Sequence, residues 1–303
     1  MPGRRPAKGP AHMDKHLLLT ISDDQSSAYK LRFIRNFFKN FCSLNLTLLA
    51  VTPASAYARD PVLYPEQAEL AEKASPASAA VQQHLDYARQ WVTSEVCQPS
   101  RVRTKILPAR GGTVETIVAE ATAGLYDAVV VGRRGLGWVS ELVEDSVSHK
   151  LLWQKIDFPV WVCAGDIEVE RRDVLLCVDG SEPSVRIADH VGFMLGAEEG
   201  HQVTLFYVKG ESDQTTAADE ARLEQATTAL LDNGFPEDRI RIKFARAAKP
   251  AEAILAEAEA GRYAVVAAGR RSDAPTGLKR LLPWGVSSKL LRELSKFCLW
   301  ISK

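Results

Sequence analysis

The chain has 303 residues, a length that suits two globular domains of ordinary size better than one. It carries 38 lysine and arginine residues and 38 aspartate and glutamate residues, and the resulting net charge of zero argues against a nucleic-acid-binding protein. No apolar run approaches the roughly 18 residues that a membrane-spanning helix needs, which argues against an integral membrane protein.

The amino-terminal residues 1–14 are basic and rich in proline and glycine, and they lack the apolar core of a secretion signal. We expect them to form a disordered tail. The chain also holds five widely spaced cysteines, Cys42, Cys97, Cys163, Cys177 and Cys298. No two of them form a CxxC pair, so we expect reduced, mostly buried thiols rather than disulfides or metal ligands. These features predict a cytoplasmic protein.

The first half of the chain contains apolar segments of strand length at residues 17–21, 46–48, 128–131 and 158–163. Continuous apolar runs of this kind are typical of parallel strands that are covered on both faces. Residues 52–80, after the second run, are rich in proline, alanine and serine, and they predict an excursion of the chain between two regular elements.

The second half of the chain predicts a regular alternation of strands and helices. The strands are expected at residues 174–178, 202–208, 240–244, 264–268 and 297–301, and the helices at 185–195, 217–233, 250–259 and 286–294. Residues 179–184 have the sequence Asp-Gly-Ser-Glu-Pro-Ser, which is typical of a tight turn that starts a helix. Such alternation implies right-handed crossovers and a doubly wound parallel sheet.

The two halves are copies of one domain. The segment Gly-Leu-Tyr-Asp-Ala-Val-Val-Val-Gly-Arg-Arg at 124–134 returns as Gly-Arg-Tyr-Ala-Val-Val-Ala-Ala-Gly-Arg-Arg at 261–271, and residues 15–19 correspond to 172–176. We therefore expect two tandem, doubly wound, Rossmann-like α/β domains, each with a parallel five-stranded sheet. Domain 1 is predicted over residues 15–164, a linker over 165–171, and domain 2 over 172–303.

The order of elements and motifs resembles the universal stress protein family, twice in one chain. The most specific pieces are the turn at 178–181, the glycine loops that begin at Gly132 and Gly269, and the terminal segment 158–162. The resemblance implies a stress-response protein. The members of this family that bind ATP use an aspartate after the first strand and a loop of the form G-x2-G-x9-G-[ST]. The resemblance therefore implies that an ATP site in this chain would need the same features. In such a loop, glycine lets backbone N–H groups approach phosphate closely.

Domain 1 departs from that pattern at two positions. Ser22 stands where domain 2 has Asp179, and Asp145 replaces the last glycine of the loop, directly before Ser146. A carboxylate at this point would repel phosphate. We therefore expect domain 1 not to bind ATP.

Domain 2 keeps Asp179 and Gly180, and Val203 resembles the wall beside the adenine in the family. Its loop has Ser272 in place of a glycine and Trp284 where close backbone approach is needed. We expect no bound cofactor, although ATP with Mg²⁺ is the ligand that domain 2 could hold. The residues of this candidate ligand site are Asp179, Gly180, Val203, Gly269, Arg270, Gly285 and Ser287.

Several polar residues leave two interpretations open. Asp179 could coordinate Mg²⁺ or a ligand amine, or it could cap the following helix. The pairs at 133–134 and 270–271 could clamp an anion through arginine forks, or they could be solvated loop charges.

The remaining histidines and tryptophans favour structural roles. His149 lies near Ser146 and Ser148, but this spacing on one helix does not form a nucleophile–base pair with an orienting acid, and we expect a surface histidine. His190 and His201 have no partner at metal-ligand spacing. The tryptophans at 138, 161, 284 and 300 are expected to pack in cores or interfaces.

No nucleophile–base pair, metal cluster or paired carboxylates point to catalysis. We therefore expect a non-catalytic stress-response or regulatory module with degraded nucleotide binding, and neither catalytic residues nor a metal site. The alternative is an ATP-binding switch or weak ATPase that uses domain 2.

Both copies end in an apolar strand with a tryptophan, Trp161 in the first and Trp300 in the second. These side chains are too large and apolar to remain exposed on a sheet edge. Family members resemble this chain in dimerising through their fifth strands. We therefore expect the two last strands to pair antiparallel inside one chain, so that the domains form a pseudo-dimer. A homodimer of whole chains is a further expectation, with no nucleic acid or membrane as partner.

Overall fold

The computed structural model describes residues 14–22, 26–53, 76–94, 98–133, 146–163, 165, 167–210, 216–270, 285–293 and 296–303. The predicted tail lies outside this part of the chain except for Asp14, as does most of the predicted excursion at 52–80. Trp138 and Trp284 also lie outside the described residues.

Helices and strands follow the same order in both domains. Domain 1 contains β1 (His16–Thr20), α1 (Ser26–Phe37), β2 (Asn45–Thr52), α3 (Pro76–Ser94), β3 (Val102–Pro108), α4 (Thr113–Gly124), β4 (Ala128–Gly132), α6 (Val147–Trp153) and β5 (Val160–Cys163). Domain 2 contains β6 (Val174–Cys177), α7 (Glu182–Leu195), β7 (Val203–Lys209), α8 (Ala217–Asp232), β8 (Ile240–Arg246), α9 (Pro250–Ala260), β9 (Val265–Gly269), α10 (Val286–Glu293) and β10 (Cys298–Ser302).

The strands of the described residues form one continuous ten-stranded sheet, in the order β3-β2-β1-β4-β5-β10-β9-β6-β7-β8. Within each domain all neighbouring strands are parallel, and the single antiparallel contact among the described strands joins β5 to β10. The predicted α/β fold is thus confirmed. The two expected five-stranded sheets differ from the prediction only in being merged, because their last strands are hydrogen-bonded to each other.

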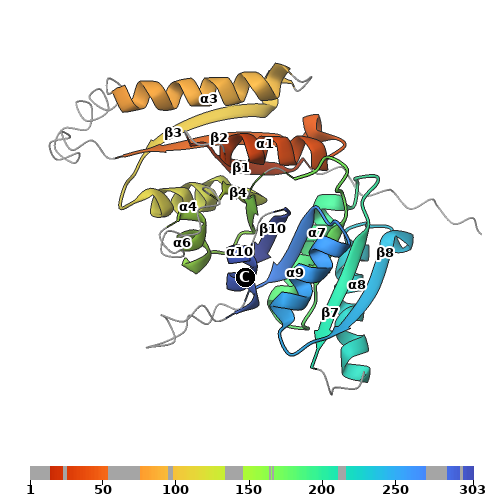
Figure 1. The fold of residues 1–303 in the computed structure, drawn as a ribbon. Helices are drawn as coiled ribbons and strands as arrows, with labels where there is room; N and C mark the ends of the chain where they lie inside the picture. Colours follow the sequence, from red (N-terminus) through yellow and green to blue (C-terminus); the bar gives the residue numbers. More distant parts are fainter. Residues whose placement is uncertain are drawn as a thin grey trace, which may run out of the picture.

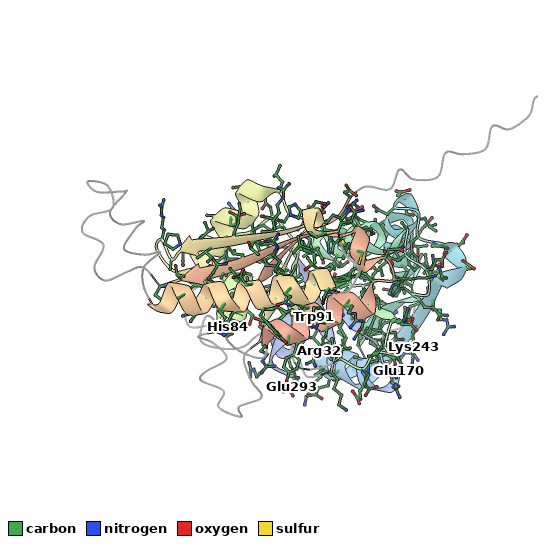
Figure 2. The ribbon with its side chains drawn as sticks, turned by 90° about the horizontal axis from the view of Figure 1, so that it is seen from above. Arg32, His84, Trp91, Glu170, Lys243 and Glu293 are labelled. Atoms are coloured by element: carbon green, nitrogen blue, oxygen red, sulfur yellow. The ribbon has the colours of Figure 1, made fainter. Side chains whose placement is uncertain are left out.

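Helices cover both faces of the sheet. Alternate residues of each strand face opposite sides. Leu17 and Leu19 of β1 accordingly belong to the core that also contains residues of α1, α3, α7 and α8, whereas Leu18 belongs to the core on the other face, with residues of α4, α6, α9 and α10. Figure 1 shows α1 and α3 on one side of the domain 1 strands and α4 and α6 on the other. Seen from above, α1 and α3 lie side by side (Figure 2). Burial on both faces explains why the strands are continuous apolar runs.

The contact between β5 and β10 aligns Trp161 with Trp300 and Cys163 with Cys298. The amide of Arg133 donates to the carbonyl of Cys163, and the amide of Cys298 donates to the carbonyl of Ala264, so the peptide groups of both cysteines point away from the β5–β10 contact. Both opposed pairs are therefore non-hydrogen-bonded pairs, in which side chains lie closest together. The structure confirms the predicted antiparallel pairing of the final strands.

Aromatic side chains fill the space above this strand pair. The rings of Trp161 and Trp300 stack with centroids 4.0 Å apart, and Phe38 and Phe37 of domain 1 cover Trp161 and Trp300 respectively. The indole N–H of Trp161 donates to Nε2 of His190 at 3.0 Å. The indole N–H of Trp300 is buried and has no oxygen or nitrogen partner among the described residues. The pair is therefore symmetric in its stacking but not in its hydrogen bonding.

Polar contacts around the carboxyl end of α7 also join the domains. The ammonium of Lys15 donates to the carbonyl of Met194 at 2.7 Å. The buried carboxylate of Glu198 accepts from the backbone amides of Lys39 and Asn40 at 3.1 and 3.4 Å. Domain 2 thus satisfies backbone groups that follow the last turn of a domain 1 helix.

The expectation of reduced thiols holds for some of the cysteines and fails for one. Cys163, Cys177 and Cys298 carry free thiols, as predicted. Cys42, however, is disulfide-bonded. The expectation of a reduced thiol is wrong for Cys42, because disulfide formation depends on the distance between Cα atoms, which spacing along the chain does not reveal.

The unequal hydrogen bonding of the two tryptophans gives a matched pair of variants. We expect Trp161→Phe to lower the free energy of unfolding by about 1–3 kcal/mol more than Trp300→Phe, because it leaves the buried Nε2 of His190 without its donor. Urea denaturation of both variants measures the difference. Equal losses would contradict an energetic role for the Trp161–His190 hydrogen bond.

The buried His190 should make stability depend on pH. Burial lowers the pKa of His190 from 6.5 to about 3. Between these values the unfolded chain binds more protons than the folded chain, so the free energy of unfolding should fall as the pH is lowered through this window.

His190→Gln keeps a side-chain acceptor for Trp161 but does not titrate, so it should flatten the fall in stability between neutral pH and about pH 4. Part of the dependence of stability on pH should persist in this variant, because burial also lowers the pKa of His201. His84→Gln, on α3 away from the strand contact, is the control. If the free energy of unfolding of His190→Gln falls with pH as steeply as that of the wild type, His190 is not the source of this pH dependence.

Candidate functional site

A doubly wound sheet binds ligands beyond the carboxyl ends of its strands. In domain 2 this edge brings together Gly180, which follows β6, and Gly269, which ends β9. A Cβ atom at Gly269 would collide with the backbone of Pro183 and Ser184 at the start of α7. Gly269 is therefore needed for the close packing of a strand end against a helix, whether or not a ligand binds.

Asp179 stabilises the turn that leads into α7. Its Oδ1 accepts from the amide of Ser181 at 2.9 Å and from the hydroxyl of Ser181 at 2.5 Å. The N-cap residue of α7 is Ser181 itself, so Asp179 does not occupy the cap position considered above. The described contacts give it a role in the turn, and its predicted contact with a ligand stays a prediction.

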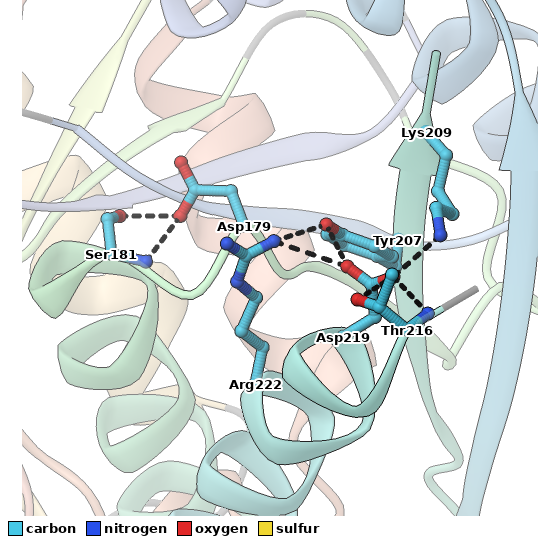
Figure 3. Close-up of polar contacts among 7 residues, drawn as sticks. All are labelled: Asp179, Ser181, Tyr207, Lys209, Thr216, Asp219 and Arg222. Atoms are coloured by element: carbon cyan, nitrogen blue, oxygen red, sulfur yellow. Dashed lines mark hydrogen bonds and ion pairs between the residues drawn. The ribbon is translucent and has the colours of Figure 1, made fainter. Parts of the chain in front are cut away.

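The side chain of Arg222 lies directly over Gly180. Gly180 has a φ of +74°, a conformation that favours glycine, and a Cβ atom there would collide with the Arg222 side chain. Figure 3 shows Arg222 reaching from α8 between the Asp179 turn and the side chains of Tyr207 and Asp219. Its Nη1 donates to the hydroxyl of Tyr207 at 2.6 Å and lies 3.3 Å from Oδ1 of Asp219. The space above the glycine is thus filled from within the chain.

Asp219 organises the cluster that holds Arg222 (Figure 3). It is buried and accepts from Lys209 at 2.6 Å, from the Tyr207 hydroxyl at 2.7 Å, and from the amide and hydroxyl of Thr216 at 2.9 and 3.0 Å. The hydrogen bonds from Lys209, then Tyr207 and Thr216, hold the pKa of Asp219 well below its usual value. Burial, together with the bond to Asp219, raises the pKa of Tyr207.

Sequence reasoning missed this cluster, although two signals were present. Tyr207 and Lys209 are polar residues at the carboxyl end of an otherwise apolar strand, where ligands are expected. Thr216 and Asp219 have the spacing of a capping box at the start of α8.

Val203 does not belong to the predicted site. It is the first residue of β7 and pairs with Val174 and Ile240, which are also first residues of their strands. At about 3.3 Å per residue, roughly 20 Å of strand separates Val203 from Lys209 at the other edge. Val203 is too far away because all these strands are parallel. Only their carboxyl ends lie beside the glycines of the candidate site, and Val203 is at an amino end.

Gly285 and Ser287 lie at the start of α10. Gly285 is exposed and has a φ of +146°, and its carbonyl accepts a hydrogen bond from the backbone amide of Lys289. Ser287 is largely buried in the first turn. Ser272 and the loop between Arg270 and Gly285 lie outside the described residues, so the participation of Gly285 and Ser287 in a ligand site stays a prediction.

Arg133 and Arg270 make reciprocal contacts between the domains. Nη1 of Arg270 donates to the carbonyl of Leu152 at 2.6 Å, and Nη1 of Arg133 donates to the carbonyl of Leu291 at 2.8 Å. Each carbonyl belongs to the last turn of a helix, where acceptors lack helical partners. The guanidinium of Arg270 also lies 3.9 Å from the centroid of the Trp153 ring, and burial lowers its pKa to about 10.

These contacts fit neither of the two interpretations considered above for the arginine pairs, an anion clamp or a solvated loop charge. Arg133 and Arg270 instead bind the ends of helices in the opposite domain. Their neighbours Arg134 and Arg271 lie outside the described residues.

In domain 1 the corresponding positions are engaged in local hydrogen bonds. The amide of Ser22 donates to Oγ of Ser27 at 2.9 Å, and the same hydroxyl donates to the Ser22 carbonyl at 3.0 Å. Ser146 caps α6 by accepting from the amide of His149 at 3.2 Å, and Nε2 of His149 accepts from the indole of Trp153 at 2.9 Å. Asp145 lies outside the described residues, so the predicted loss of ATP binding in domain 1 stays a prediction.

Neither a metal site nor a membrane-spanning helix is found among the residues that the structure describes. No group of three or more His, Cys, Asp or Glu side chains among them is arranged to hold a metal ion. No helix within them is both long enough and apolar enough to cross a membrane.

Comparisons with known proteins support the repeat and the fold. A search of curated proteins finds no match. A universal stress protein from Archaeoglobus fulgidus DSM 4304 is similar at 17% identity and a TM-score of 0.65, over 95% of this chain and 96% of that one. A functionally unknown protein from Pseudomonas aeruginosa PAO1 is similar at 17% identity and a TM-score of 0.58, over 96% of this chain and 92% of that one.

The family model described as "Universal stress protein family" matches twice, at residues 13–164 and 170–299. Each match covers one of the two sequence repeats and one half of the sheet. The chain belongs to the universal stress protein family, as a member with two tandem domains.

Proposed function

We propose that this stress-response protein acts without catalysis, as a pseudo-dimer whose domain 2 nucleotide site is filled by its own side chains. The observation that carries the proposal is the placement of Arg222 over Gly180. A nucleotide that approaches the turn between β6 and α7 needs the backbone surface that a glycine leaves open. In this chain that surface is already covered.

Displacing Arg222 has an energetic cost. Its guanidinium would lose the hydrogen bond to Tyr207 and its proximity to the Asp219 carboxylate. The Arg222 side chain is 42% exposed, so solvent screens the charge interaction and the cost is moderate. The cluster beneath it is more firmly held, because Lys209 and Asp219 are both buried and paired with each other.

The other polar groups of the candidate site also have partners within the chain. Asp179 accepts two hydrogen bonds from Ser181, and Arg270 donates to Leu152 in the other domain. A ligand would have to compete with these contacts rather than fill unmet hydrogen-bonding capacity. This supports degraded nucleotide binding in domain 2.

One observation favours the alternative, an ATP-binding switch. The partly exposed Arg222 stands beside the turn, and a guanidinium released from Tyr207 could form a forked contact with phosphate. The two functions therefore give opposite expectations for removal of this side chain.

We expect wild-type protein to bind ATP weakly or not at all, and Arg222→Ala to bind it at least about tenfold more tightly, a gain of about 1.4 kcal/mol, because the surface of Gly180 is uncovered. Isothermal titration calorimetry with ATP and Mg²⁺ measures the change. Arg241→Ala removes the same charge from an exposed position near the amino end of β8 and is the matched control.

Weaker ATP binding in Arg222→Ala than in wild type would instead identify Arg222 as a phosphate ligand and support the switch. Release of phosphate from ATP in the same samples, absent from a domain 2 variant such as Asp179→Ala, would support the weak ATPase. Equal binding by wild type and Arg222→Ala would show that Arg222 does not close the site.

A further inference from the structure

Two free thiols face each other across the contact that joins the domains. Cys163 is the last residue of β5, Cys298 is the first residue of β10, and the two are directly opposed in register. Their sulfur atoms lie 3.2 Å apart, and both side chains are fully buried. None of the contacts described for the candidate nucleotide site uses these sulfurs.

The backbone around this pair suits a disulfide bond. Cys163 and Cys298 form a non-hydrogen-bonded pair, as the hydrogen bonds of their peptide groups to β4 and β9 show. The Cα atoms of such a pair are about 4.5 Å apart, which is within the range of about 4.4–6.8 Å found for disulfides. The sulfurs need only approach from 3.2 Å to about 2.05 Å, a shift that side-chain rotation can supply.

We propose that Cys163 and Cys298 are a reversible oxidation site, at which a peroxide converts the two thiols into a disulfide that joins domain 1 covalently to domain 2. The proposal does not depend on nucleotide binding. A thiol reductant returns the pair to the state seen in the structure.

The chemistry balances with hydrogen peroxide as the oxidant. The sulfur of one cysteine attacks a peroxide oxygen, the O–O bond breaks, and the leaving hydroxide takes the thiol proton to form water, which gives a sulfenic acid. The sulfur of the second cysteine then attacks the sulfenic sulfur. The S–S bond forms, the S–O bond breaks, and a second water leaves with the remaining thiol proton. Two thiols lose two electrons in total, and one peroxide gains them.

Access to the sulfurs should control the rate of this reaction. Burial, and then the neighbouring Cys163, raise the pKa of the Cys298 thiol, while the side chain of Trp300 partly opposes the shift. Because the thiolate is the reactive form, the closed contact protects the pair. Cys163 and Cys298 share one face of the strand pair with the stacked Trp161 and Trp300, so opening of this contact exposes sulfurs and rings together.

The bond would also restrain the carboxyl end of β4. Cys163 pairs with Gly132 in the sheet, and its carbonyl accepts from the amide of Arg133. The side chain of Arg133 in turn binds the carbonyl of Leu291 in domain 2. A disulfide at Cys163 therefore holds Gly132 and Arg133 in place beside domain 2.

The test uses the full-length wild-type chain, treated with hydrogen peroxide and then with an alkylating reagent under denaturing, non-reducing conditions. Peptide mapping should recover a linked pair of peptides that contain Cys163 and Cys298, with the mass of two hydrogens lost, and dithiothreitol should separate them. The melting temperature of the oxidised chain should rise by about 5–10 °C, because the bond restricts the unfolded state.

Cys163→Ser and Cys298→Ser should each abolish the linked peptides and the rise in melting temperature. Cys177→Ser is the matched control, because Cys177 is a free cysteine at the end of β6, and it should retain both effects. If the serine variants fail to fold, the peptide map of the wild type still decides. Recovery of both cysteines as alkylated thiols, or their conversion to sulfinic acids without a linked peptide, would overturn the proposal.

Discussion

The structure depends on one constraint, the open edge of a parallel five-stranded sheet. In each domain the last strand would leave a row of unpaired N–H and C=O groups and a large indole facing water. Antiparallel pairing of β5 with β10 satisfies both edges at once and leaves Trp161 and Trp300 fully buried. The tandem arrangement therefore gives each domain a permanent partner within the same chain.

Pairing two similar domains in one chain lets their equivalent positions diverge. The stacked tryptophans are nearly parallel, at an interplanar angle of 4°, yet only Trp161 has a histidine to receive its indole N–H among the described residues. Domain 2 has an Asp-Gly-Ser turn beside a buried ion pair, whereas domain 1 has a local hydrogen-bond pair between Ser22 and Ser27. The two halves share their packing but not their polar chemistry.

The candidate site and the domain contact are physically connected. Arg133 and Arg270 directly follow the glycines that end β4 and β9, and both reach helix carbonyls in the opposite domain. Displacing either guanidinium would therefore remove a hydrogen bond to the other domain. The same contact carries the opposed thiols of Cys163 and Cys298 beside the domain 1 loop.

The amino-acid sequence by itself determined the repeat and the alternating elements, and its apolar tryptophan-bearing last strands indicated that these edges are covered. The antiparallel pairing of those strands was expected from the resemblance to the universal stress protein family. Tertiary structure alone decided that Arg222 covers Gly180, that Val203 lies at the far edge of the sheet, and that Arg270 binds Leu152. It also decided that Cys42 is disulfide-bonded. Each of these depends on which side chains meet when elements distant in sequence pack together. Residue type and spacing along the chain do not specify those contacts.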